Sequence, residues 1–254
     1  LNRDGFEDLV IGAGRGSSLL VYYGQKDGQF KFVQGPVAEL DQTGVIGWTA
    51  KAGAPTLLTG SSNLEAPDRA FVQSPSVLGF NVGQNFTTDI SLTGNRSATG
   101  PMAVADVDGD GDNDIITSLA AHEFGLAWFE QMKAGGGGIT FKKHLIMGST
   151  RRENKYGVVF SELHATGLHD MDGDGLKDIV TGKTYWSHHK QSSQWDAGAV
   201  VYWFKLVRGK DGVDFVPQRA DTDSGLGRQV SIGDVNGDGL PDIVSAGMKG
   251  TQVL

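Results

Sequence analysis

Residues 106–116 read Asp-Val-Asp-Gly-Asp-Gly-Asp-Asn-Asp-Ile-Ile, a run in which acids and glycines lead into an apolar pair. The same frame returns at residues 170–180 as Asp-Met-Asp-Gly-Asp-Gly-Leu-Lys-Asp-Ile-Val and at residues 234–244 as Asp-Val-Asn-Gly-Asp-Gly-Leu-Pro-Asp-Ile-Val. The first acids of successive copies are 64 residues apart in both intervals. Self-similarity at a fixed period is the signature of a repeat architecture, so the chain is first of all a series of repeated units.

A partial copy opens the sequence. Asn2-Arg-Asp-Gly-Phe-Glu-Asp8 fits the frame from its third position onward, and its first ligand position would precede Leu1. We therefore expect the chain to begin inside a unit and to be a fragment of a longer repeat array.

A fifth unit has the apolar part of the frame without its acids. Residues 56–60 (Thr-Leu-Leu-Thr-Gly) align with residues 178–182 (Asp-Ile-Val-Thr-Gly), the run that follows the acidic loop. This alignment puts neutral residues at the acid positions, namely Trp48, Ala50, Ala52 and Thr56. The unit is expected to keep its strands and to bind no cation.

Each unit contains up to four short apolar stretches separated by Gly-rich or polar turns, which favours β-strands. In the unit of Asp106 these stretches span residues 102–107, 114–119, 125–131 and 139–147. Helical periodicity is essentially absent. Four strands per unit, repeated, are typical of a β-propeller blade, whereas a β-sandwich would require the motifs to coincide by chance. We predict an all-β propeller of about four blades plus a partial one, at residues 1–40, 41–95, 96–160, 161–225 and 226–254 (incomplete).

The acidic loops have the composition of a hard-cation site. Oxygens at positions 1, 3 and 5 of a tight loop converge, and a carbonyl at position 7 and a carboxylate at position 9 complete the set. Calcium takes 6–8 oxygen ligands, so these groups and water suffice, whereas magnesium keeps several waters. Without a cation the clustered carboxylates would repel one another. An EF-hand would need Glu at position 12 and flanking helices, but position 12 is Thr117, Thr181 or Ser245 in β-type sequence.

These loops resemble the FG-GAP/VCBS repeats of integrin-α-type β-propellers, and the resemblance covers essentially the whole chain. It implies that each loop joins the first two strands of a blade and binds calcium, mostly in a structural role. Propellers of this kind usually have seven blades, so this chain would be part of one. Carried over by position, the implied ligands of the three complete loops and the truncated one are Asp106, Asp108, Asp110, Asp112 (carbonyl) and Asp114; Asp170, Asp172, Asp174, Leu176 (carbonyl) and Asp178; Asp234, Asn236, Asp238, Leu240 (carbonyl) and Asp242; and Asn2, Asp4, Phe6 (carbonyl) and Asp8.

Blade topology sends the other loops to the opposite face. Loops between second and third strands and links between blades would carry four of the six histidines there, while His144 and His169 fall in strands. The polar and aromatic residues expected on this rim are His122, Glu123, Glu162, His164, Trp186, His188, His189, Trp195, Asp196, Asp221, Asp223 and Arg228.

Two interpretations of this rim stay open. Polar residues gather in long loops because loops are solvated, and this is the simpler reading. Alternatively the rim binds a metal, a sugar or a substrate near the propeller axis, with His122, His164 and His188 as weak catalytic candidates. The loop from Trp186 to Ala197 is long for a propeller turn, and long loops are often functional.

Composition narrows the class of protein. The 254 residues include no Cys, which removes disulfide scaffolds and thiol chemistry, and no apolar run approaches the ~20 residues of a membrane span. The net charge of -8 argues against nucleic-acid binding. Fourteen of the 30 acids are aspartates of the four loops, so the rest of the chain has 22 Lys and Arg against 16 acids. Since Arg96, Arg151, Arg152 and Arg228 fall in loops away from the calcium face, an anionic partner is plausible.

We therefore predict a calcium-stabilised binding or scaffold module that recognises a protein or a glycan outside the cell, in the periplasm or on the cell surface. External calcium is abundant enough for loops of this kind. An enzymatic alternative is a propeller lyase, dehydratase or hydrolase acting on carbohydrate through the histidine-bearing face. A third alternative is a structural subunit of a larger extracellular assembly.

Overall fold

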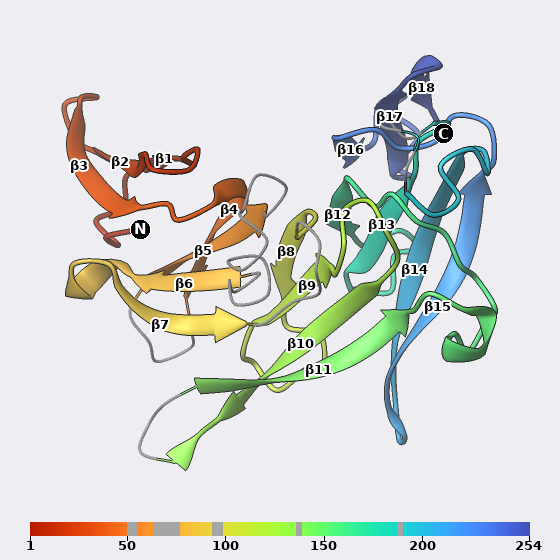
Figure 1. Cartoon of the computed structure of the whole chain (residues 1–254), viewed down its shortest axis with the longest axis horizontal. Coiled ribbons are helices and arrows are strands. Elements are labelled where there is room, and N and C mark those ends of the chain that lie inside the picture. Colours follow the sequence, from red (N-terminus) through yellow and green to blue (C-terminus); the bar gives the residue numbers. More distant parts are fainter. Residues whose placement is uncertain (50–54, 63–76, 93–98, 136–138, 187–189, 191) are drawn as a thin grey trace.

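A computed structural model describes the chain except for residues 50–54, 63–76, 93–98, 136–138, 187–189 and 191. The described residues form five antiparallel sheets that follow one another along the chain. In each sheet the strands lie in chain order, so every sheet is a simple meander. Figure 1 shows the five sheets side by side in an arc, with the N-terminal and C-terminal sheets at its two ends. This is the arrangement of β-propeller blades, and it confirms the predicted fold class.

The strand bounds follow the sequence pattern closely. The first sheet is β1 (Leu9–Ile11), β2 (Ser18–Gly24) and β3 (Phe30–Val37); the second is β4 (Asp41–Thr49), β5 (Pro55–Ser62), β6 (Val77–Asn81) and β7 (Thr87–Leu92); the third is β8 (Met102–Ala105), β9 (Asp114–Ser118), β10 (Leu126–Lys133) and β11 (Ile139–Met147); the fourth is β12 (Thr166–His169), β13 (Asp178–Lys183), β14 (Val200–Gly209) and β15 (Gly212–Asp221); the fifth is β16 (Val230–Gly233), β17 (Asp242–Gly247) and β18 (Gly250–Val253). Helical turns in the described part are the 3-10 segments η1 (Val82–Gln84) and η3 (Arg151–Glu153). No helix there is long and apolar enough to span a bilayer.

The first strands of neighbouring sheets lie next to one another, since β8 contacts both β4 and β12, and β12 contacts β16. These strands form the inner rim of the arc (Figure 1). The second strand of each central blade is sandwiched between neighbouring sheets, and every residue of β9 and of β13 is buried. The continuous apolar runs that follow the acidic loops therefore belong to strands covered on both faces.

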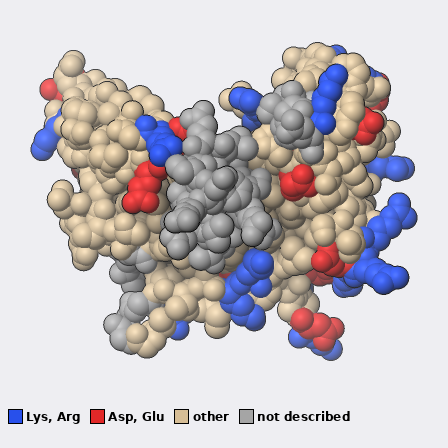
Figure 2. Space-filling model, viewed as in Figure 1, with Lys and Arg blue, Asp and Glu red and all other residues tan. Residues whose placement is uncertain are grey.

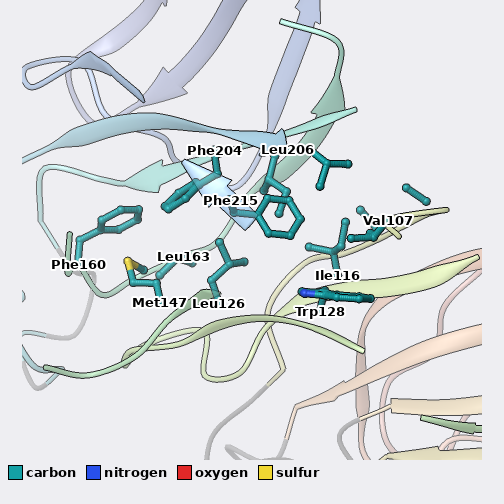
Figure 3. Packing of buried hydrophobic residues seen from close by; sticks show 13 residues of the cluster. Val107, Ile116, Leu126, Trp128, Met147, Phe160, Leu163, Phe204, Leu206 and Phe215 are labelled. Atoms are coloured by element: carbon teal, nitrogen blue, oxygen red, sulfur yellow. The ribbon is translucent and has the colours of Figure 1, made fainter. Parts of the chain in front are cut away.

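The hydrophobic core lies between the blades. The largest cluster joins the third and fourth sheets, where Trp128 and Leu126 of β10 face Phe204 and Leu206 of β14 and Phe215 of β15 (Figure 3). Three smaller clusters occupy the other junctions between successive sheets. The aromatic residues of the third strands, Trp128 and Phe129 of β10 and Tyr202, Trp203 and Phe204 of β14, pack between the blades.

The second sheet differs from the others in its first hairpin. Its first strand, β4, has nine residues, whereas β8, β12 and β16 have four each. β4 pairs with β5 from Asp41 opposite Ser62 to Thr49 opposite Pro55. The blade around Trp48 therefore keeps the predicted strands, and its first hairpin is longer mainly at the end away from the turn, with one further pair, Thr49 opposite Pro55, on the turn side.

Candidate functional site

The acidic loops are closed by the carboxylate at their first position. The backbone N–H of Gly109 donates to Asp106 Oδ1 (2.7 Å) and that of Gly111 to Asp106 Oδ2 (3.2 Å). Both glycines have φ near +90°, a conformation that residues with a Cβ rarely adopt. The same hydrogen bonds and left-handed glycines recur in the other complete loops, at Asp170, Gly173, Gly175, Asp234, Gly237 and Gly239. The fourth position of the frame thus needs glycine as much as the sixth.

In the third and fourth blades the last acid of the loop ties the loop to the third strand. Asp178 Oδ2 accepts the backbone N–H of Met171 (2.9 Å), and its Oδ1 accepts the N–H of Leu206 in β14 (2.8 Å). Asp114 does the same with the N–H groups of Val107 and of Gln131 in β10. Burial raises the pKa of Asp178 and raises that of Asp114 to about 6.

Carboxylate oxygens gather in two of the loops. One oxygen each from Asp106, Asp108 and Asp114 lie within 4.8 Å of one another, and so do oxygens from Asp170, Asp172 and Asp178. Ca²⁺ binds oxygen at about 2.3–2.6 Å, so ligands on opposite sides of one ion are up to about 5 Å apart. Both clusters therefore have the spacing that a calcium ion requires.

The fifth and seventh positions are linked in the same way in every loop. The backbone N–H at position 7 donates to the side chain at position 5, which turns the chain sharply. The pairs, with N···O distances of 2.8–2.9 Å, are Phe6 with Asp4, Asp112 with Asp110, Leu176 with Asp174, and Leu240 with Asp238. In the N-terminal and C-terminal loops, Asn2 and Asn236 each donate from the side-chain amide to the acid at position 5. Asp8 accepts from Gly24 of β2, whereas Asp242 accepts from Val235 of its own loop.

Basic side chains reach two of the loops from β14. Lys205 Nζ forms ion pairs with Asp172 and with Asp174 (3.1 Å to the latter). These hydrogen bonds raise the pKa of Lys205 to about 12. Arg208 donates to the backbone carbonyls of Asp106 and Val107. Lys205 therefore competes with any cation for two acids of its loop, a feature that the loop sequence alone does not indicate.

The alignment of the acid-free unit needs a correction of one residue. Trp48 pairs directly with Thr56, as Ala105 pairs with Asp114 in the next blade. Trp48 is thus the equivalent of Ala105 rather than of Asp106, because the connection from Trp48 to Thr56 is one residue shorter than that from Ala105 to Asp114. Trp48 is buried between the second and third blades. Ala50 and Ala52 lie outside the described residues.

Three of the rim residues converge at a second centre. Glu162 Oε2 lies 3.1 Å from His164 Nε2 and 3.6 Å from His122 Nδ1, and the two imidazole centroids are 4.8 Å apart. Glu162 is fully buried, which opposes its charge, but the nearby His122 and His164 imidazoles and the Ser192 hydroxyl hold its pKa well below the usual range. Glu162 also adopts φ +65°, which costs about 1–3 kcal/mol for a residue other than glycine.

Neighbouring loops hold this centre in place. The Ser192 hydroxyl donates to Glu162 Oε1, the backbone N–H of Ser193 donates to Glu123 Oε1 (3.2 Å), and the Ser161 hydroxyl donates to the carbonyl of Ser193 (2.6 Å). The β9–β10 loop, the β11–β12 link and the β13–β14 loop are thereby joined. The sequence placed the two histidines and Glu162 on one rim but gave no sign of the serine.

A buried lysine lies close to the same loops. Lys183 of β13 is 1% exposed, and its Nζ donates to the carbonyls of Thr184 (3.0 Å) and Trp195 (3.4 Å). Burial lowers its pKa, while the charges of Glu162 and Asp196 act in the opposite direction.

The two imidazoles border a cavity of about 510 Å³ at the inner rim. Its walls come from four successive blades and include Thr43, Met102, His122, His164 and Arg228. Access to the histidines is therefore from the inner side of the arc.

The remaining rim residues are dispersed. Trp186 is half exposed, and Lys249 Nζ pairs with Asp223 and lies 4.6 Å above the ring of Tyr185. Asp221 accepts three hydrogen bonds from the turn at Asp223 and Ser224. His188, His189 and Arg96 lie outside the described residues.

The two histidines predicted to be strand residues are in strands. His144 of β11 stacks on Trp128 (4.3 Å between centroids) and bonds Glu130, whereas His169 ends β12.

Blades of this topology, with an aspartate-rich turn between first and second strands, define a repeat-containing β-propeller. The sequence profile of the FG-GAP-like repeat matches residues 170–245, which run from the acidic loop of the fourth sheet into β17 of the fifth, and this match agrees with the propeller fold. It is similar to integrin alpha pat-2 of Caenorhabditis elegans, with 26% identity over 190 residues, which cover 65% of this chain. The matched region is 14% of that integrin's length.

Proposed function

We propose that this chain is the calcium-stabilised part of an extracellular or cell-surface β-propeller that binds a partner macromolecule. The observation that carries the proposal is the clustering of three carboxylates in each of two loops at the spacing of one calcium ion. The ligands would be the acids named above, with backbone carbonyls at position 7. Each bound ion would hold the turn between first and second strands, and Asp114 and Asp178 would connect that turn to the third strand.

The similarity to an integrin α-chain favours a protein partner. The distribution of charge is compatible with an anionic surface or an acidic glycan, since the face in Figure 2 shows Lys and Arg at many points and no continuous acidic area among the described residues. Arg151 and Arg152, which are exposed in the β11–β12 link, are among the basic residues outside the acidic loops. Once calcium neutralises the loops, the net charge of -8 no longer describes the surface that a partner meets.

Thermal unfolding in calcium and in EDTA tests the calcium part of this proposal. We expect a clear rise in melting temperature with calcium, and a smaller rise for a variant that carries Asp106→Asn and Asp170→Asn. An equal melting temperature in EDTA and in calcium would exclude structural calcium. Binding to arrays of acidic and neutral glycans, alongside capture of proteins from an extracellular fraction, separates the two classes of partner.

A second function is favoured by the convergence of His122, Glu162 and His164 on a cavity. A carbohydrate-active lyase, dehydratase or hydrolase would place its sugar in that cavity and use an imidazole for proton transfer. Turnover of uronic-acid or neutral oligosaccharides that disappears in His164→Ala, with unchanged melting temperature, would support catalysis. Absence of turnover together with glycan or protein binding would exclude the enzymatic function and support the function as a binding module.

A further inference from the structure

We propose that His122, Glu162 and His164 form a site for a divalent transition metal, with zinc as the best match. The inference is independent of the calcium loops and holds whether the propeller binds its ligand or transforms it. Two imidazole nitrogens and one carboxylate oxygen are a frequent protein ligand set for Zn²⁺. Calcium prefers an all-oxygen shell, so this centre selects a different ion from the loops.

The distances in the centre match a zinc coordination sphere. Zn–N and Zn–O bonds of about 2.0–2.2 Å at tetrahedral angles separate neighbouring ligand atoms by about 3.3 Å. The Glu162 oxygen lies 3.1 Å from one imidazole nitrogen and 3.6 Å from the other. The three ligand atoms all lie within 4.8 Å of one another. A metal ion can therefore enter with small side-chain movements.

The carboxylate is held in the orientation that a ligand needs. Ser192 donates to Glu162 Oε1, which leaves Oε2 directed at the two imidazoles. Glu162 is fully buried and its backbone is in the left-handed region, so the surrounding loops impose its position. Outer hydrogen bonds of this kind orient metal ligands, and we assign Ser192 as a positioning residue.

The geometry leaves one side of the ion open. The two histidines line the cavity, whereas the carboxylate lies behind them and is shielded from solvent. Three protein ligands with a free fourth position are the arrangement of sites at which zinc binds water or an exogenous oxygen. The cavity gives such a ligand room beside the metal.

Zinc binding in saturating calcium tests the proposal, because calcium then fills the acidic loops. The purified protein is titrated with zinc against a chromophoric chelator. We expect one zinc per chain, and a loss of affinity of more than about 100-fold in His122→Ala and in His164→Ala. Ser192→Ala is expected to lose about 10- to 100-fold, as outer-shell partners do. The matched control is His144→Ala, which removes a histidine that also bonds a glutamate and should leave zinc affinity unchanged.

Absence of zinc binding, or equal binding by His164→Ala, overturns the proposal. If the alanine variants do not fold, the visible spectrum of the unaltered protein with bound cobalt tests whether the three side chains form a metal site. Intense d–d bands of four-coordinate cobalt support the site, and a weak six-coordinate spectrum contradicts it. Neither measurement depends on the protein having an enzymatic activity.

Discussion

Substitution of Asp178 by alanine tests whether the last acid of an acidic loop is a structural connection as well as a cation ligand. The carboxylate is fully buried and accepts one backbone N–H from its own loop and one from β14. Asp178→Ala leaves both N–H groups without their acceptor. A buried polar group left unsatisfied costs about 1–3 kcal/mol, so the two together cost about 2–6 kcal/mol.

Part of that loss is recovered. Burial raises the pKa of Asp178, which means that the folded state destabilises its charge, and alanine removes this unfavourable charge. The expected net loss in EDTA is about 2–4 kcal/mol of unfolding free energy. In calcium the difference from the unaltered protein should increase, because the variant also loses a ligand.

Urea unfolding followed by tryptophan fluorescence, in EDTA and in calcium, measures both effects. Asp211→Ala, in the exposed turn between β14 and β15, is the matched control and should stay within about 0.5 kcal/mol of the unaltered protein. If Asp178→Ala is equally neutral in EDTA, the connecting role assigned to this carboxylate is wrong. If it is destabilised in EDTA but responds fully to calcium, the ligand role is wrong.

Three further outcomes are expected. Lys205→Met should tighten calcium binding at its loop, because it removes the ammonium that pairs with two acids there, and a calorimetric titration that shows unchanged affinity would contradict the competition. Hydrogen bonds hold the pKa of Asp221 at about 2, so the stabilisation from its charge is present above about pH 4 and is lost as the pH falls through 2. The difference in unfolding free energy between the unaltered protein and Asp221→Asn should therefore shrink between about pH 4 and about pH 2. A difference that stays constant over this interval would refute the assigned role of the Asp221 charge. Phe204→Ala, 2% exposed in the core between the third and fourth sheets, should cost about 3–5 kcal/mol by chemical denaturation, whereas Trp186→Ala at a half-exposed site should cost little.

The blades could be predicted from sequence because their determinants are local. An Asp/Gly frame followed by a continuous apolar run specifies a tight turn and a buried strand, and β11 has the predicted bounds of Ile139 and Met147. Where the acids are missing, nothing fixes the turn length, and this is why Trp48 was placed one residue too far along. In a hairpin without the acidic motif, the register depends on strand pairing that cannot be read from the sequence.

The centre formed by His122, Glu162 and His164 could be predicted from the sequence only in part, for a different reason. Loop topology brought His122, Glu162 and His164 to one rim, but their separation of a few ångströms depends on how two neighbouring blades pack. The contribution of Ser192 comes from a loop of the fourth sheet, 30 residues further along the chain than Glu162. Contacts between distant loops of this kind carry no sequence periodicity.

Because the β4–β5 hairpin is long, removal of calcium by a chelator is expected to destabilise the five blades to different extents. Its ladder runs through nine residues of β4 and residues 49–55 contain no acid, while the four-residue first strands of the next three blades each end at an acidic turn. In a chelator, amide hydrogens of β8, β12 and β16 should therefore exchange faster, and those of β4 should keep their protection. We therefore expect the second blade to respond least to calcium, and the blades with acidic turns on both sides of it to loosen when calcium is withdrawn.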